Sequence, residues 1–147
     1  MTEAEFRIKH SQLIEYYQSI EWRLKGICAA ILADEEKGWF ERLDDYETDA
    51  FGALIKTVQS LQKEKHITLL NQEDAASLNA LRQDRNYWVH VCFIGNNDQE
   101  LPITFNKSEL KRSTFAQRLT RSLNNAIEWD EKLVKISKQL KDILKNH

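Results

Sequence analysis

The chain has 147 residues and a formal net charge of −2, and its composition includes only four Gly and one Pro. This length allows one domain with a real core, and the scarcity of helix breakers together with 30% charged residues favours an all-α protein. No apolar run approaches the roughly 20 residues that span a bilayer, and the N-terminus, MTEAEFRIKH, has no apolar signal segment. We therefore expect one helical domain over residues 1–147, located in the cytoplasm and away from membranes.

In the first half of the chain, apolar residues recur at helical spacing in two segments. The first segment predicts a long helix over about residues 3–34, and the second predicts a helix over about residues 46–64. Between them, Lys37–Phe40 interrupts the pattern, so we expect a loop with buried aromatic side chains. His10 lies on the apolar stripe of the first helix, and we interpret it as a hydrogen-bonded interior or interface histidine rather than a catalytic one.

Two further helices are predicted in the second half. Asn71 is a suitable N-cap for a helix that continues to about Phe93 and ends before the Gly95–Asp98 segment. The residues that follow, as far as 106, are expected to be extended or irregular, and Ser108 then caps a last helix to about Lys145. Four such helices predict an up-and-down bundle with long first and last members, whose projecting apolar ends a partner subunit would cover.

The most informative segment is RNYWVH, residues 85–90. The guanidinium of Arg85 can hold phosphate oxygens through two parallel hydrogen bonds, and the imidazole of His90 can exchange a proton near neutral pH. Asn86 shares a helix face with His90, whereas Arg85 lies about 140° away from His90 around an ideal α-helix. That spacing favours a site in which Arg and His meet across a dimer interface.

Two simpler interpretations accompany this segment. Position 85 lies on the apolar stripe of its helix, so Arg85 could form a buried ion pair with an acid on the first helix, such as Glu15 or Glu21. His90 could be an ordinary surface residue near a helix end.

Positive charge is concentrated towards the C-terminus. From Lys107 onward there are ten basic residues (Lys or Arg) and five acidic residues (Asp or Glu), a charge of +5. The first 106 residues contain eleven basic and eighteen acidic residues, a charge of −7. Lys111, Arg112, Arg118 and Arg121 could follow an RNA backbone. The alternative is an ordinary solvated helix face.

RNYWVH resembles the Arg-x4-His signature of the HEPN superfamily, in which a polar residue, here Asn86, follows the Arg. Phe51–Lys56, with the sequence FGALIK, resembles the Gly-x-Leu-Ile segment of some bacterial members, and the order of the helices also agrees. The resemblance implies a metal-independent endoribonuclease that works without a cofactor, as a homodimer with paired motifs lining a cleft between subunits.

The resemblance also implies a role for each residue of the motif. Arg85 would bind and polarise the scissile phosphate, and Asn86 would orient the His or the phosphate. His90 would act as base or acid while the ribose 2′-hydroxyl attacks its own phosphorus, giving a 2′,3′-cyclic phosphate and a 5′-hydroxyl.

Many bacterial HEPN proteins are toxins or phage-defence components, so a cognate antitoxin is an expected partner beside the RNA substrate. Two other function classes stay open. One is a non-catalytic HEPN-like module that binds nucleotide or RNA, or that dimerises. The other is a helical adaptor in which RNYWVH occurs by coincidence.

Overall fold

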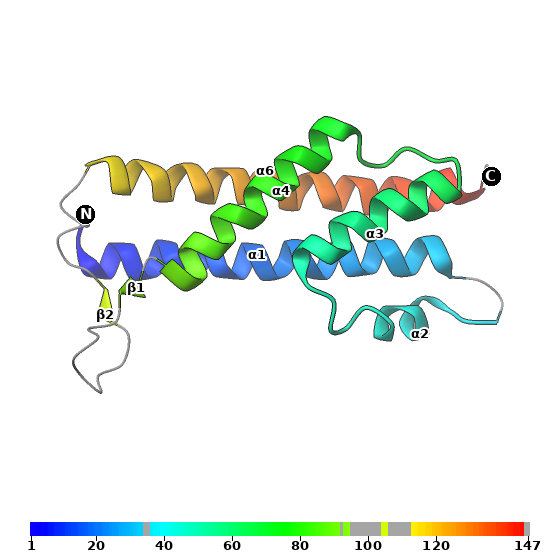
Figure 1. The fold of residues 1–147 in the computed structure, drawn as a ribbon, viewed down its shortest axis with the longest axis horizontal. Coiled ribbons are helices and arrows are strands. Elements are labelled where there is room, and N and C mark those ends of the chain that lie inside the picture. The colour runs from blue at the N-terminus through cyan, green and yellow to red at the C-terminus, as the bar shows by residue number, and fades with distance from the viewer. Residues whose placement is uncertain (34–35, 92, 95–103, 106–112, 146–147) are drawn as a thin grey trace.

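Two long helices, α1 (Glu3–Leu32) and α6 (Ser113–Lys145), lie side by side along the molecule (Figure 1). Two shorter helices, α3 (Phe51–Glu64) and α4 (Gln72–Asn86), lie across this pair. The computed structural model describes residues 1–33, 36–91, 93–94, 104–105 and 113–145, and for residues 90, 91, 93, 94, 104, 105 and 113 it describes the backbone alone. The predicted all-α fold with long first and last helices is confirmed.

Side-chain caps explain why two of the helices begin where they do. The Thr2 hydroxyl accepts the Glu5 amide at the start of α1, and the Glu5 carboxylate accepts the Thr2 amide in return. Asn71 and Asp74 form the same reciprocal pair at the start of α4, as expected for Asn71. Such pairs satisfy amide groups that have no partner inside the helix.

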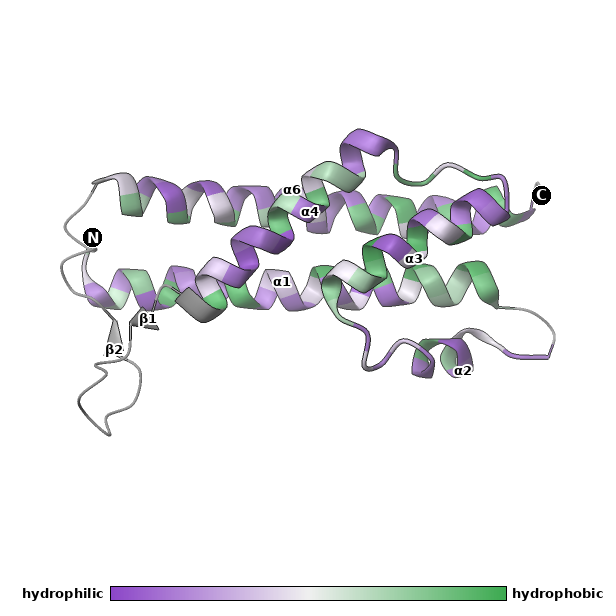
Figure 2. Cartoon of the chain, viewed as in Figure 1, coloured by the Kyte–Doolittle hydropathy of each residue, from purple (hydrophilic) through white to green (hydrophobic). Residues whose placement is uncertain are grey.

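One apolar core holds the four helices together. On α1 it takes a residue from almost every turn, and the C-terminal end of this helix is hydrophobic (Figure 2). Burying each large apolar side chain contributes about 1.5–3 kcal/mol. The largest of the fully buried side chains are Trp88, Tyr17, Phe6 and Phe51.

The direction of the helices differs from a strict up-and-down order. The rings of Phe6 and Phe115, near the starts of α1 and α6, are 5.6 Å apart, and further along the Ser19 hydroxyl donates to Asp130. These contacts show that α1 and α6 are parallel, whereas α4 runs antiparallel to both (Figure 1). The segment between α1 and α3 brings the chain back before α3 starts, so α3 runs in the direction of α1.

The segment between α1 and α3 contains α2 (Trp39–Asp44), so the predicted loop at Lys37–Phe40 is confirmed for Lys37 and Gly38 and wrong for Trp39 and Phe40, which begin α2. Trp39 packs on α1, where its indole N–H donates to the Gly26 carbonyl at 3.0 Å, but Phe40 is 78% exposed. In a helix the two neighbouring side chains point about 100° apart, so only one of them faces α1. The second predicted helix also begins later than expected, at Phe51.

The third predicted helix does not continue as an α-helix to Phe93. After Asn86 the chain forms a π-helix over Tyr87–Val91, and then β1 (Phe93–Ile94) pairs antiparallel with β2 (Thr104–Phe105). The expected Ser108 cap lies outside the described residues, and the described part of the last helix begins at Ser113.

Candidate functional site

Arg85 lies in the last turn of α4 with its guanidinium near α1. Its Nη2 is 3.7 Å from Oε2 of Glu21, and the side chains of Arg85 and Glu21 are 31% and 23% exposed. Of the two acids expected as partners, the structure selects Glu21. The same carboxylate lies 3.5 Å from Nζ of Lys25, so Arg85 shares its counter-charge with a second cation.

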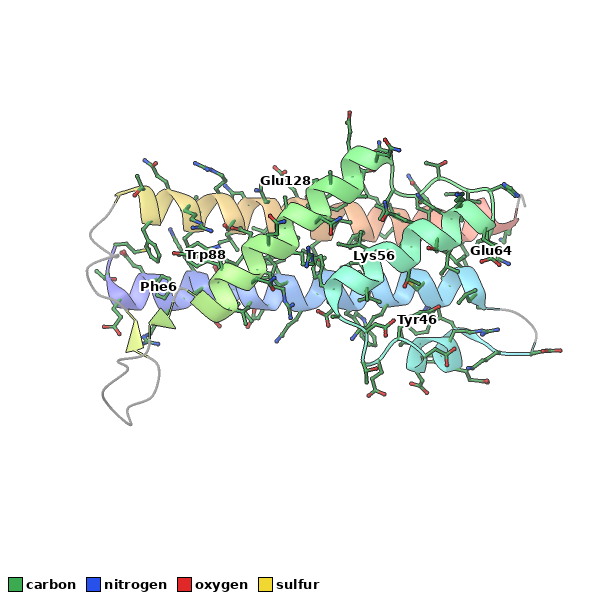
Figure 3. All side chains as sticks on the ribbon, viewed as in Figure 1. Phe6, Tyr46, Lys56, Glu64, Trp88 and Glu128 are labelled. Carbon is green, nitrogen blue, oxygen red and sulfur yellow. The ribbon has the colours of Figure 1, made fainter. Side chains whose placement is uncertain are left out.

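A cavity of about 400 Å³ opens beside Arg85, between the start of α3 and the second half of α4. Arg85 and Asn86 line it together, so the structure brings these two predicted site residues to one place. Lys56 (Figure 3) and Arg82 add two more cations to the wall, and none of the described residues that line it carries a carboxylate. The remaining lining residues are Ala50, Phe51, Gly52, Ala53 and Asn79.

Gly52 leaves room for the Arg82 side chain at this cavity. A Cβ at this position would lie 3.0 Å from Cδ and 3.6 Å from Nη1 of Arg82, tighter than ordinary van der Waals contact for the nearer atom. The absence of a side chain at Gly52 therefore lets Arg82 lie against the first turn of α3. The FGALIK segment and the RNYWVH segment, which the resemblance singled out separately, meet at this cavity.

His90 belongs to the π-helix that follows α4, but its side chain lies outside what the structure describes. A π turn bonds residues five apart and holds more residues per turn than an α turn. The angle of about 140° for an ideal α-helix therefore does not apply between positions 85 and 90. Arg85 lies in α4 and His90 in the π-helix, so the two positions belong to helices of different geometry.

Two hydrogen bonds of Trp88 hold this π-helix against the rest of the bundle. Trp88 is 0% exposed, and its indole N–H donates to the Ser122 hydroxyl on α6 at 2.9 Å. Its backbone carbonyl accepts a hydrogen bond from Nε2 of His10 on α1 at 2.8 Å. His10 is thus the hydrogen-bonded histidine that the sequence predicts, and its partner belongs to the motif.

Arg118 and Arg121 line a different groove, of about 580 Å³, between α4 and α6. Nη2 of Arg118 lies 3.6 Å from Oδ1 of Asp84, and its guanidinium stacks 3.5 Å above the ring of Tyr87. Ion pairing and cation–π stacking both favour this placement. Arg118 therefore serves the packing of α6 on α4, and the structure does not bring these two arginines to Arg85.

Asp84 also accepts a hydrogen bond from the Tyr17 hydroxyl, at 3.4 Å. Burial of the phenol, assisted by the negative charge of Asp84, raises the pKa of Tyr17 well above its ordinary value of 10.0. Tyr17 therefore stays neutral near pH 7 and acts as a hydrogen-bond donor. The other two predicted RNA-binding residues, Lys111 and Arg112, lie outside the described residues.

Sequence reasoning gave no role to Lys56, the last residue of the FGALIK segment, and did not single out Asn79 and Arg82. A signal was present, because Asn79, Arg82 and Asn86 have the i, i+3, i+7 spacing of one helix face. That polar stripe had no evident partner until α3 was placed beside it.

Comparison of the chain with protein-family models, curated proteins and solved structures found no match. Within the described part of the chain, no three or more His, Cys, Asp or Glu side chains form a group that could hold a metal ion. The described helices also include none with the length and apolar character that crossing a membrane requires.

Proposed function

We propose that this chain is a HEPN-type endoribonuclease that acts as a homodimer and cuts RNA without a metal ion. One observation carries the proposal: Arg85 and Asn86 line a cationic cavity, directly before a π-helix that contains His90. A π-helix within an α-helical segment is rare and frequently occurs at functional sites. Arg85 retains 31% exposure, so its guanidinium can exchange the distant Glu21 carboxylate for a phosphate.

The proposed reaction needs only groups that the motif supplies. His90 takes the proton of a ribose 2′-hydroxyl, and the resulting oxygen attacks the adjacent phosphorus. The bond from phosphorus to the 5′-oxygen breaks, and that oxygen receives a proton from the imidazolium of His90. The products are a 2′,3′-cyclic phosphate and a 5′-hydroxyl. Proton transfer of this kind contributes about 10²–10⁴-fold in rate, and Arg85 stabilises the charge that develops on the phosphate oxygens.

The first test is cleavage of single-stranded RNA in the presence of EDTA. Wild-type protein should cut the RNA, and His90→Ala and Arg85→Ala should abolish cutting while keeping the helical circular dichroism of the wild type. His66→Ala is the matched control, because His66 is exposed and lies at the far end of α3. A substrate with 2′-deoxyribose should stay intact, and cutting of that substrate would rule out the 2′-hydroxyl route.

A mixing experiment tests whether the site is shared between two subunits. Neither His90→Ala nor Arg85→Ala carries a complete motif, but a mixed dimer would contain one site with Arg85 from one subunit and His90 from the other. In a symmetric dimer that exchanges subunits freely, the equimolar mixture should regain about a quarter of the wild-type activity. An inactive mixture would show that the Arg and the His act within one chain.

We further propose that the protein is a toxin or a phage-defence component that a cognate antitoxin silences. Inducible expression should arrest growth and degrade cellular RNA, whereas His90→Ala at equal protein level should do neither. Normal growth and intact RNA with the wild type would contradict this role.

One observation favours a second candidate, a binding module that does not cleave. The cavity is rich in cations, but among the described residues that line it there is no imidazole or carboxylate that could move a proton. Salt-dependent binding of RNA without cleavage would support this candidate over the nuclease.

A further inference from the structure

Lys56 and Arg82 are cations that no acid of the described chain neutralises. Both line the cavity beside Arg85, and neither forms an ion pair within the part of the chain that the structure describes. Three positive charges that converge on one concave space repel one another, and an anion in that space would stabilise all three. Arg85 has Glu21 as its counter-charge, so the excess belongs to Lys56 and Arg82.

The Arg82 side chain is held in place by packing and lacks a hydrogen bond at one of its nitrogens. Gly52 lets it lie on the first turn of α3, and its Nε is sealed from solvent without a hydrogen-bond partner. A buried donor without an acceptor costs free energy. If the guanidinium turned towards the cavity, Nε and one Nη would form a two-pronged donor for a phosphate, which is the geometry that arginine uses for phosphate.

The start of α3 adds backbone donors to the same wall. The first turn, Phe51–Ala53, lines the cavity. The N-cap residue Ala50 has only a methyl side chain, which cannot accept hydrogen bonds from the amide groups of this turn. Amide groups in the first turn of a helix have no partner within the helix, and the helix dipole favours negative charge there. They reinforce the preference for an anion that Lys56 and Arg82 already create.

We propose that Lys56, Arg82 and the first turn of α3 form a second phosphate-binding site, next to the phosphate that Arg85 and Asn86 hold. The ligand class is single-stranded RNA, whose neighbouring phosphates occupy the two sites in turn. The proposal rests on the proposed function in taking RNA as the source of the phosphates. The second site binds and positions the strand, and the chemistry stays with Arg85 and His90.

The test measures binding separately from cleavage. A fluorescein-labelled 2′-O-methyl oligoribonucleotide cannot be cut, and its anisotropy reports binding to the full-length protein at several salt concentrations. Arg82→Gln and Lys56→Gln should each weaken binding about tenfold, and each should reduce the salt slope by about 0.7, the value for one phosphate contact on a single strand. Lys63→Gln is the matched control, since it removes an exposed cation of α3 that does not line the cavity.

A third variant tests the cavity without changing charge. Gly52→Val would place methyl groups where Arg82 now lies, and it should weaken binding as Arg82→Gln does. Circular dichroism and the urea midpoint identify any variant that fails to fold, and the two Gln variants keep the proposal testable if Gly52→Val is among these. If both Gln variants bind with the affinity and salt slope of Lys63→Gln, the second site is refuted.

Two outcomes separate this proposal from the nuclease, and a third tests the class of ligand. If wild-type protein never cuts RNA but Arg82→Gln loses binding, the nuclease fails and the second site stands. If wild-type protein cuts RNA and Arg82→Gln cuts it with unchanged KM, the second site fails and the nuclease stands. If AMP or inorganic pyrophosphate binds as tightly as the oligonucleotide, and with the same dependence on Arg82, the assignment to an RNA strand is overturned.

Discussion

The hydrogen bond from His10 to the Trp88 carbonyl can be tested with His10→Leu. Nε2 of His10 lies 2.8 Å from this oxygen, in the π-helix that includes His90. Leu fills much of the same space beside Phe6 and Trp88 but cannot donate a hydrogen bond. The substitution therefore leaves a part-buried carbonyl without this partner while it keeps most of the apolar contact.

The expected loss follows from that carbonyl. Loss of a typical hydrogen bond costs about 0.5–1.5 kcal/mol. In a chain of this size each kcal/mol lowers the melting temperature by roughly 2–4 °C, so His10→Leu should melt about 1–6 °C below wild type. His10→Gln keeps an N–H donor on a side chain of similar reach, and its loss should be smaller.

Urea unfolding, followed by circular dichroism and by tryptophan fluorescence, measures the difference in the free energy of unfolding. The m-value should stay constant, because the buried core is unchanged. If His10→Leu unfolds at the same urea concentration as wild type, or at a higher one, the hydrogen bond does not stabilise the π-helix. On the proposed function, His10→Leu should also reduce RNA cleavage more than RNA binding, because Arg85 lies before the π-helix and His90 lies within it.

His66 adopts φ 56° after the end of α3, where the Ile67 amide donates to the Gln62 carbonyl. A positive φ strains the backbone of a residue with a side chain but not that of glycine, so His66→Gly should raise the free energy of unfolding by about 0.5–1 kcal/mol. An unchanged or lower melting temperature would contradict this backbone strain. Glu21→Gln removes the carboxylate that lies 3.7 Å from Arg85. Without this competing charge, the 2′-O-methyl oligonucleotide should bind about fivefold more tightly, or by roughly 1 kcal/mol. Weaker binding in the anisotropy assay would mean that Glu21 orients Arg85 for its ligand. Burial raises the pKa of Cys28 from 9.0 to about 12, so the folded state favours the neutral thiol; its stabilising effect is complete below pH 9 and is lost as the pH rises towards 12. The melting temperature should therefore fall from about pH 9 upward and fall less in Cys28→Ala, and a profile that stays flat above pH 9 would refute this linkage.

The sequence determined the elements and the faces they bury. Apolar spacing on α1 identified a buried stripe, and Asn71 marked the start of α4 through its capping pair with Asp74. The expectation of a hydrogen-bonded His10 is confirmed, and Glu21 is one of the two acids that were expected within reach of Arg85. These features are local, because they depend on which residues share one helix face or one helix end.

Helix periodicity could not reveal the departures from regular geometry. In the π-helix at Tyr87–Val91, Trp88 forms hydrogen bonds with Ser122 on one helix and His10 on another, and these partners lie far away in sequence. Phe40 was expected to be buried because it is apolar, but α1 contacts only the neighbouring face of α2.

The tertiary structure alone decided where the charges meet. Arg85 and Arg118 are both basic residues, yet Arg85 lines the cavity beside α3 and Arg118 is paired with Asp84 in the groove beside α6. At the cavity, Gly52 leaves room for the Arg82 side chain against the first turn of α3, a contact between residues thirty positions apart. Sequence spacing shows which face of a helix is polar, but a binding site also depends on which other helix faces it and how closely the two can approach.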